Sequence, residues 1–112
     1  MTSPGPDILR GTLDLLILKA LSWGPLHGYA VARWIEAATG DALAVGEGSL
    51  YPALHRLEER DWISATWGAS ENNRHAKFYA LTRRGRTQLR EETNNWRRYA
   101  AAVFAALEAP RP

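Results

Sequence analysis

The feature that most constrains this 112-residue chain is a long amphipathic pattern near its C-terminal end. Thr82 is a favourable N-cap and Pro110 stops a helix, so residues 82–109 are predicted to form one uninterrupted helix. At 1.5 Å per residue such a helix is about 40 Å long and outreaches a preceding domain of about 80 residues. Its apolar stripe consists of Leu89, Trp96, Tyr99, Ala100, Val103, Phe104 and Leu107. The far end of this stripe therefore needs a partner to cover it.

A first helix is predicted over residues 8–22, after a loose leader of residues 1–7, and it is apolar on two sides. The wide side consists of Leu9, Leu13, Leu16, Ile17, Ala20 and Leu21. The opposite side consists of Ile8, Leu15 and Leu18. A helix that is apolar on two sides is buried on two sides, and in so small a chain we interpret the second side as a contact with a second subunit. The predicted dimer interface is thus Ile8, Leu15, Leu18, Leu89, Trp96, Tyr99, Val103 and Leu107.

Two more helices are predicted in the middle of the chain. A turn over residues 23–28 leads to a helix over residues 28–38, which ends before Gly40. Its inner stripe is Val31, Trp34, Ile35 and Ala38, with Tyr29, Arg33 and Glu36 outside. The next helix starts between Gly46 and Ser49 and ends at Arg60, with a core stripe of Leu50, Leu54 and Leu57. Pro52 loses no hydrogen bond if Ser49 is the N-cap, whereas an earlier start would make it bend the helix.

Two segments alternate between apolar and other residues, as strands do. They cover residues 62–67 and 75–81, and the polar stretch 68–73 between them predicts a β-hairpin. We interpret four tryptophans as core or hairpin packing: Trp23, Trp34, Trp62 and Trp67. The fold class is therefore mainly α with a small β-hairpin. It is a winged helix-turn-helix over residues 8–81 followed by a dimerisation helix over residues 82–109.

The charge of the chain is uneven although the formal net charge is only +2. Residues 1–54 hold three basic residues against five acidic ones, a net −2, whereas residues 74–98 hold eight against two, a net +6. A basic block in a nearly neutral protein suggests either a surface for a polyanion or a solvated, arginine-rich helix face.

Several classes of protein are excluded or unsupported. The absence of cysteine excludes disulfides, thiolate metal sites and a cysteine nucleophile. The three histidines (His27, His55 and His75) are too dispersed for a metal site, and no catalytic triad, carboxylate pair or phosphate-binding glycine loop is present. We therefore expect no enzyme activity, no cofactor and no metal. No apolar run is long enough to span a membrane and no signal peptide is evident, so we expect a cytoplasmic chain.

Four segments, in order and at the expected spacing, resemble the PadR family of bacterial transcriptional regulators. They are residues 10–18 (RGTLDLLIL), 27–31 (HGYAV), 48–60 (GSLYPALHRLEER) and 79–85 (YALTRRG). The third is the most specific. The single C-terminal helix is similar to the short subclass, in which this helix pairs with the first helix of the partner subunit. Asp61 stands where the family usually has glycine, so the bend after the third helix requires a left-handed aspartate.

The resemblance implies double-stranded DNA as the partner of the third helix and of the hairpin. A recognition helix enters the major groove with the N-terminal residues opposite its core stripe. The predicted DNA-binding residues are Ser49, Tyr51, His55 and Arg56 on that helix, Arg74, His75 and Lys77 on the wing, and Tyr29 before it. Hydroxyls and basic side chains at such positions bind phosphates or base edges. For Tyr29, a packing role is the open alternative.

The rest of the basic block lies on the final helix, which we expect to run away from DNA. We interpret its members as solubilising or dimer-rim charge: Arg83, Arg84, Arg86, Arg90, Arg97 and Arg98. Trp96 lies in the middle of the dimer stripe and either packs the dimer or, as the resemblance to multidrug-responsive members implies, stacks on a small aromatic or hydrophobic effector.

The sequence thus predicts a homodimeric, sequence-specific transcriptional regulator, a ligand-responsive repressor of a (pseudo)palindromic operator. The alternative is a winged helix that binds another protein without reading DNA. An apolar or acidic outward face on the third helix would favour that alternative, and Tyr51, His55 and Arg56 on this face weigh against it.

Overall fold

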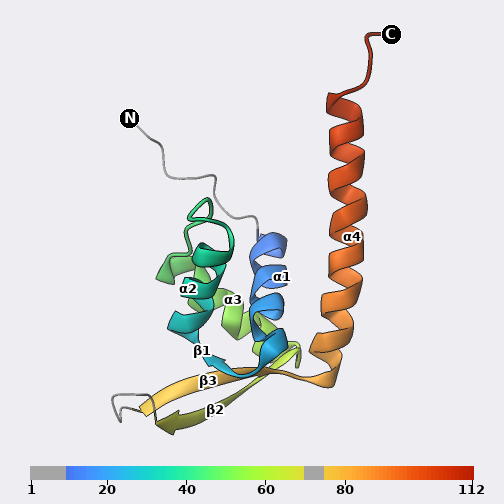
Figure 1. The fold of residues 1–112 in the computed structure, drawn as a ribbon. Coiled ribbons are helices and arrows are strands. Elements are labelled where there is room, and N and C mark those ends of the chain that lie inside the picture. Colours follow the sequence, from blue (N-terminus) through green and yellow to red (C-terminus); the bar gives the residue numbers. More distant parts are fainter. Residues whose placement is uncertain (1–9, 70–74) are drawn as a thin grey trace.

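A computed structural model describes residues 10–69 and 75–112 and shows a small helical body from which one long helix projects (Figure 1). Its elements are α1 (Arg10–Ala20), the 3₁₀ turn η1 (Leu21–Trp23), β1 (Leu26–His27), α2 (Gly28–Ala38), α3 (Glu47–Glu59), β2 (Ile63–Ala69), β3 (His75–Leu81) and α4 (Arg83–Leu107). The predicted leader and the first two residues of the first predicted helix lie outside the described residues, as does the tip of the hairpin. No helix in the described part is long and apolar enough to cross a membrane.

The core lies where α1, α2 and α3 pack together, and α1 also contacts α4. Leu50, Leu54 and Leu57 are at most 2% exposed, which confirms the predicted core stripe of α3. On α2 the predicted inner residues Val31 and Ile35 are completely buried, whereas Ala38 is exposed and Ala32 is buried in its place. The largest fully buried side chains are Ile17, Leu18, Leu21, Val31, Ile35, Leu54, Leu57 and Ile63.

The sheet has three antiparallel strands in the order β1-β3-β2. The predicted hairpin is confirmed, with Ile63 opposite Leu81 and Ala65 opposite Tyr79. The third strand, β1, falls inside the predicted turn, where Leu26 and His27 pair with Tyr79 and Phe78. Two residues are too few to show an alternation, so this strand had no signal in the sequence.

Helix α3 begins earlier than a Ser49 cap would allow. Gly46 is the N-cap and Glu47 the first helical residue, so Pro52 lies inside the helix and cannot donate to the carbonyl of Gly48. At the other end of α3, Asp61 adopts a φ of 61°, which confirms the left-handed aspartate predicted there.

The predicted Thr82 cap is also confirmed, because the Thr82 hydroxyl accepts the N–H of Gly85 at 3.0 Å. Helix α4 then runs to Leu107, with Glu108 as its C-cap. It stands beside α1 and extends well past it, so that the described residues span 62 × 39 × 21 Å (Figure 1).

Candidate nucleic-acid interface

The N-terminal turns of α2 and α3 meet at Gly28. This residue is buried, and a Cβ atom there would lie 3.1 Å from Cε1 of the Tyr51 ring, so the absence of a side chain lets Tyr51 lie against α2. Tyr51 and the neighbouring Tyr29 are 46% and 59% exposed. The close approach therefore places Tyr51, in the second turn of α3, against the first turn of α2, which also carries the exposed Tyr29.

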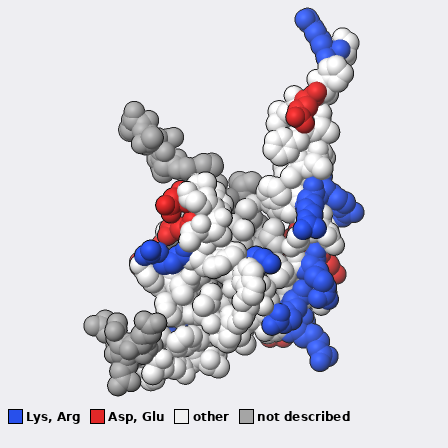
Figure 2. Space-filling model, in the orientation of Figure 1, with Lys and Arg blue, Asp and Glu red and all other residues white. Residues whose placement is uncertain are grey.

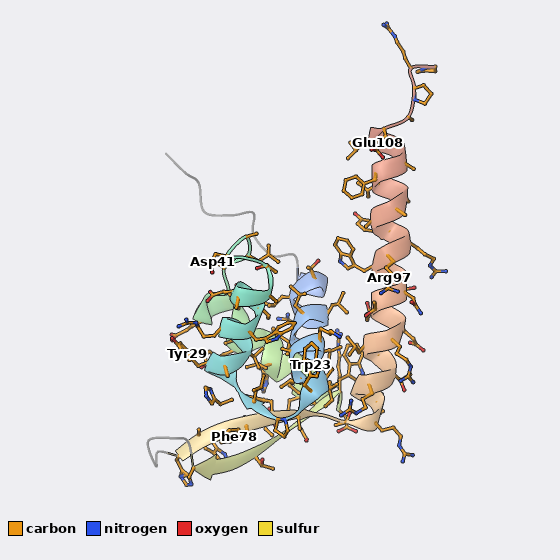
Figure 3. The ribbon with its side chains drawn as sticks, in the orientation of Figure 1. Trp23, Tyr29, Asp41, Phe78, Arg97 and Glu108 are labelled. Atoms are coloured by element: carbon orange, nitrogen blue, oxygen red, sulfur yellow. The ribbon has the colours of Figure 1, made fainter. Side chains whose placement is uncertain are left out.

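His27 fixes the start of α2. Its Nδ1 accepts the backbone N–H of Ala30 at 3.1 Å, which makes it the N-cap of the helix. Its ring stacks beside Tyr29 with a centroid distance of 6.4 Å and meets the ring of Phe78 edge-on at 5.9 Å. Figure 3 shows Tyr29 at the outer edge of the body, above the strand that carries Phe78.

Arg33 is a cation at this surface that sequence reasoning placed outside the core but did not assign to DNA. Its Nη1 donates to the Tyr29 hydroxyl at 3.0 Å, and this bond raises the pKa of the Arg33 guanidinium further. The signal was present in the sequence, because residues four apart share one face of a helix. A hydroxyl beside a permanent cation at a helix N-terminus suits a phosphate oxygen.

On α3, Ser49 and His55 are exposed as expected. The His55 side chain is 73% exposed and its Nε2 lies 3.5 Å from Oε1 of Glu59, one turn further along. Both residues are therefore accessible to a partner, on the same helix as Tyr51.

Arg56 requires a correction. Its Nη2 lies 2.9 Å from Oδ1 of Asp14 on α1, and the two side chains are only 24% and 12% exposed. Arg56 therefore turns inward rather than toward DNA. At 100° per residue it lies at the edge of the buried stripe, next to Ala53, so its long side chain reaches α1 along the core.

The base of the wing carries Lys77 and His75, and Arg74 lies outside the described residues. Lys77 Nζ lies 3.4 Å from Oε1 of Glu58, with both side chains 36% exposed, so this cation is shared with the end of α3. His75 is exposed and lies beside Trp67 with a ring centroid distance of 5.8 Å. Trp67 is predicted to pack in the core or hairpin, but it is 67% exposed. It lies on the same face of β2 as the buried Ile63, four residues earlier, and continues that face beyond the body of the chain.

Tyr79 lies beneath this region and is 5% exposed. Burial raises the pKa of its phenol, and the nearby charge of Lys77 opposes that effect. The neutral phenol ring supports the wing at the point where β1 and β2 both pair with β3.

The predicted dimer residues divide into two groups. Leu18 is completely buried within this chain, so its assignment to a subunit interface is corrected. Leu89 is partly buried and packs against its own core, and its assignment to the interface stays a prediction. The far half of α4 instead exposes an apolar row, at 42% for Trp96, 63% for Tyr99, 40% for Val103, 61% for Phe104 and 74% for Leu107. Leu15 is partly exposed, and Ile8 lies outside the described residues.

Trp96 joins this row to α1. Its Nε1 donates to Oγ1 of Thr12 at 3.2 Å, and its ring meets that of Tyr99 edge-on at 6.3 Å. Two aromatic faces thus lie next to each other beside the first helix, in a row that remains accessible.

The arginines of α4 lie apart from the tyrosines. Figure 2 shows them gathered along α4, and all six are exposed: Arg83, Arg84, Arg86, Arg90, Arg97 and Arg98. In Figure 3, Arg97 and Tyr29 lie on opposite sides of the molecule. This placement agrees with an arginine face that does not belong to the helix-turn-helix surface.

Trp23 is a further correction, since it is 68% exposed rather than core. It packs on Trp34 at a centroid distance of 5.4 Å beside an open hollow of about 380 Å³. Within the described residues, no three histidine or acidic side chains are grouped so as to hold a metal ion.

These elements define a winged helix-turn-helix protein with a long C-terminal helix. A family model described as the transcriptional regulator PadR-like family matches residues 17–91. The chain therefore belongs to the PadR-like family, whose members are DNA-binding transcriptional regulators and not enzymes.

Individual relatives are similar over most of their length. A solved PadR family transcriptional regulator from Eggerthella lenta is 31% identical, with a TM-score of 0.77 over 90% of this chain and 86% of that one. A PadR-like transcriptional regulator from Bacillus cereus is 29% identical, with a TM-score of 0.76 over 92% and 98%. A protein from Lysinibacillus sphaericus is 31% identical over 90 residues, which is 80% of this chain and 83% of the relative.

Proposed function

We propose that this protein is a homodimeric repressor that reads a (pseudo)palindromic operator with α3 and grips the flanking phosphates with α2 and the wing. The observation that carries the proposal is the contact of Tyr51 with Gly28, which places exposed Tyr51 of α3 against the first turn of α2, where Tyr29 is also exposed. Backbone N–H groups and hydroxyls at helix starts are suited to phosphates. Ser49 and His55 on α3, with His75 and Lys77 on the wing, extend the same surface.

Dimerisation is proposed from the apolar row on the far half of α4. Five large apolar side chains, each at least 40% exposed, form one side of α4 where this helix extends beyond the body of the chain. An exposed apolar row of this kind is typical of an interface. A two-fold pairing through α4 would set the distance between two recognition helices and hence the half-site spacing.

An effector is proposed at Trp96. Its ring and that of Tyr99 are accessible and edge-on to each other, and their exposed faces suit a planar aromatic or hydrophobic molecule stacked between subunits. An effector bound there would strengthen or weaken DNA binding by changing the angle between the paired α4 helices.

The test uses fluorescence anisotropy with the duplex upstream of the protein's own gene and a scrambled duplex of equal length, at several salt concentrations. The variant Tyr29→Phe/Tyr51→Phe removes two hydroxyls and should weaken operator binding about tenfold, since a hydrogen bond contributes roughly 0.5–1.5 kcal/mol. The control Arg97→Gln removes a charge on the opposite side of the molecule and should leave the affinity unchanged.

Equal affinity for both duplexes at every salt concentration would contradict sequence-specific binding and favour the protein-interaction alternative. Weakening by Arg97→Gln but not by the tyrosine variant would place DNA on α4 instead of on the helix-turn-helix.

A further inference from the structure

The ion pair between Asp14 and Arg56 joins two helices that the proposed function treats separately. Asp14 lies on α1 and is 8% exposed, and Arg56 lies on α3 with its Nη2 only 2.9 Å from the Asp14 carboxylate. Arg56 Nε is also buried, and within the described residues it has no hydrogen-bond partner. The Arg56 side chain is therefore largely but not fully buried at 24% exposure, and among the described residues its hydrogen bond is to the Asp14 carboxylate.

Such a pair adds little to the free energy of folding, but it strongly favours one placement of α3 relative to α1. The cost of removing two charges from water offsets much of their attraction. Losing one partner, however, leaves an uncompensated charge in a low-dielectric setting, which the surrounding helices relieve by moving. The pair therefore restricts where α3 can lie relative to α1.

Helix α1 is held at a second point by α4. Thr12, two residues before Asp14, accepts the hydrogen bond of the Trp96 indole at 3.2 Å. Between α1 and α4 there is also a small cavity of about 70 Å³, lined by residues that include Asp14, Leu15, Trp62 and Glu92. The packing at this joint is therefore incomplete.

We propose that Asp14 and Arg56 are positioning residues for DNA recognition. They fix the recognition helix to α1, so that the contact of α1 with Trp96 sets the position of Tyr51 and His55. This inference rests on the proposed DNA-binding function and assigns to Arg56 a role without direct contact to DNA.

Salt dependence separates positioning from direct contact. A phosphate contact contributes about −0.9 to the slope of log K against log salt concentration. Positioning predicts that Asp14→Asn and Arg56→Gln each weaken operator binding about tenfold with the slope unchanged, as mutations along a coupling network do. The double variant Asp14→Asn/Arg56→Gln removes both charges, so that neither is left uncompensated, and it should recover most of the affinity. If Arg56 contacts DNA, Asp14→Asn does not weaken binding, and the double variant stays as weak as Arg56→Gln with a reduced slope.

Amide hydrogen exchange without DNA provides a readout that does not depend on the proposed function. Asp14→Asn should increase exchange along α3 in the folded dimer, and the double variant should restore it. The matched control is Asp41→Asn, which changes an exposed aspartate in a left-handed position that asparagine also adopts. Unchanged exchange in α3 overturns the positioning role whether or not the protein binds DNA, whereas a wild type without operator binding overturns only the proposed function. If a single variant fails to fold, operator affinity and amide exchange are measured on the double variant, and these two measurements decide between positioning and direct contact.

Discussion

A Cβ atom on Gly85 would overlap the backbone carbonyl oxygen of Trp62. The same carbonyl accepts the N–H of Thr82 at 3.1 Å, and the Thr82 hydroxyl donates to the carbonyl of Asp61 at 2.6 Å. The first turn of α4 is thus seated on the corner between α3 and β2. Because α4 carries the apolar row, this corner sets the direction of the proposed dimer arm relative to the recognition helix.

Gly85→Ala should therefore destabilise the fold. Overpacking against backbone costs about 1–3 kcal/mol, because a carbonyl cannot rotate away as a side chain can. Urea denaturation followed by circular dichroism measures the change in the free energy of unfolding. The control Gly11→Ala lies in α1 with no atom within 4 Å of the added Cβ, so it should stabilise the chain by about 0.5–1 kcal/mol. Equal stability of wild type and Gly85→Ala would contradict the close seating of α4.

The sequence predicts most of this architecture because its core helices have clean periodicity. Leu50, Leu54 and Leu57 recur on one side of α3. The N-cap at Thr82 and the bend at Asp61 depend on the chemistry of single residues, which the sequence also shows. Where the outcome depends on a distant element, the prediction fails. β1 is a strand only because β3 lies beside it.

The errors in the site have the same origin. Helical angle places Leu18 opposite the wide side of α1, but it does not say that the chain's own fold buries that side too. Arg56 was assigned to DNA from residue type and helix face, whereas its partner Asp14 lies 42 residues away in the chain. Long-range contacts of flexible side chains are not encoded in local periodicity.

The cap at His27 predicts a stability effect that depends on the acceptor. His27→Ala removes the acceptor of the Ala30 N–H and should cost about 1 kcal/mol, whereas His27→Asn supplies another N-cap acceptor and should restore most of it. Thermal denaturation of the three proteins measures the difference. If alanine and asparagine destabilise equally, the stacking of His27 on Tyr29 and Phe78 matters more than the cap.

The apolar row predicts the assembly state. Phe104→Glu places a charge in the row and should shift the protein from dimer to monomer in sedimentation velocity, because an interfacial carboxylate loses its hydration without a partner. Ala105→Glu is the matched control, because at 100° per residue Ala105 lies on the side of α4 opposite the row and is exposed. The Ala105 variant should sediment like the wild type. Monomers for both variants, or for neither, would contradict dimerisation through this row.

Tyr79 predicts a loss of stability at alkaline pH. Burial raises the pKa of Tyr79 above its ordinary value of 10.0, so the unfolded chain releases this proton at a lower pH than the folded chain. Stability falls wherever the unfolded state binds fewer protons, and the contribution of Tyr79 is therefore complete below about pH 10 and is lost as the pH rises toward the raised folded-state pKa. One proton adds a slope of at most about 1.4 kcal/mol per pH unit.

Urea denaturation between about pH 8 and pH 11 should show this slope in the wild type and a shallower one in Tyr79→Phe, which retains the ring without the titrating hydroxyl. Identical slopes for the two proteins would mean that Tyr79 ionises equally well in the folded and unfolded chains.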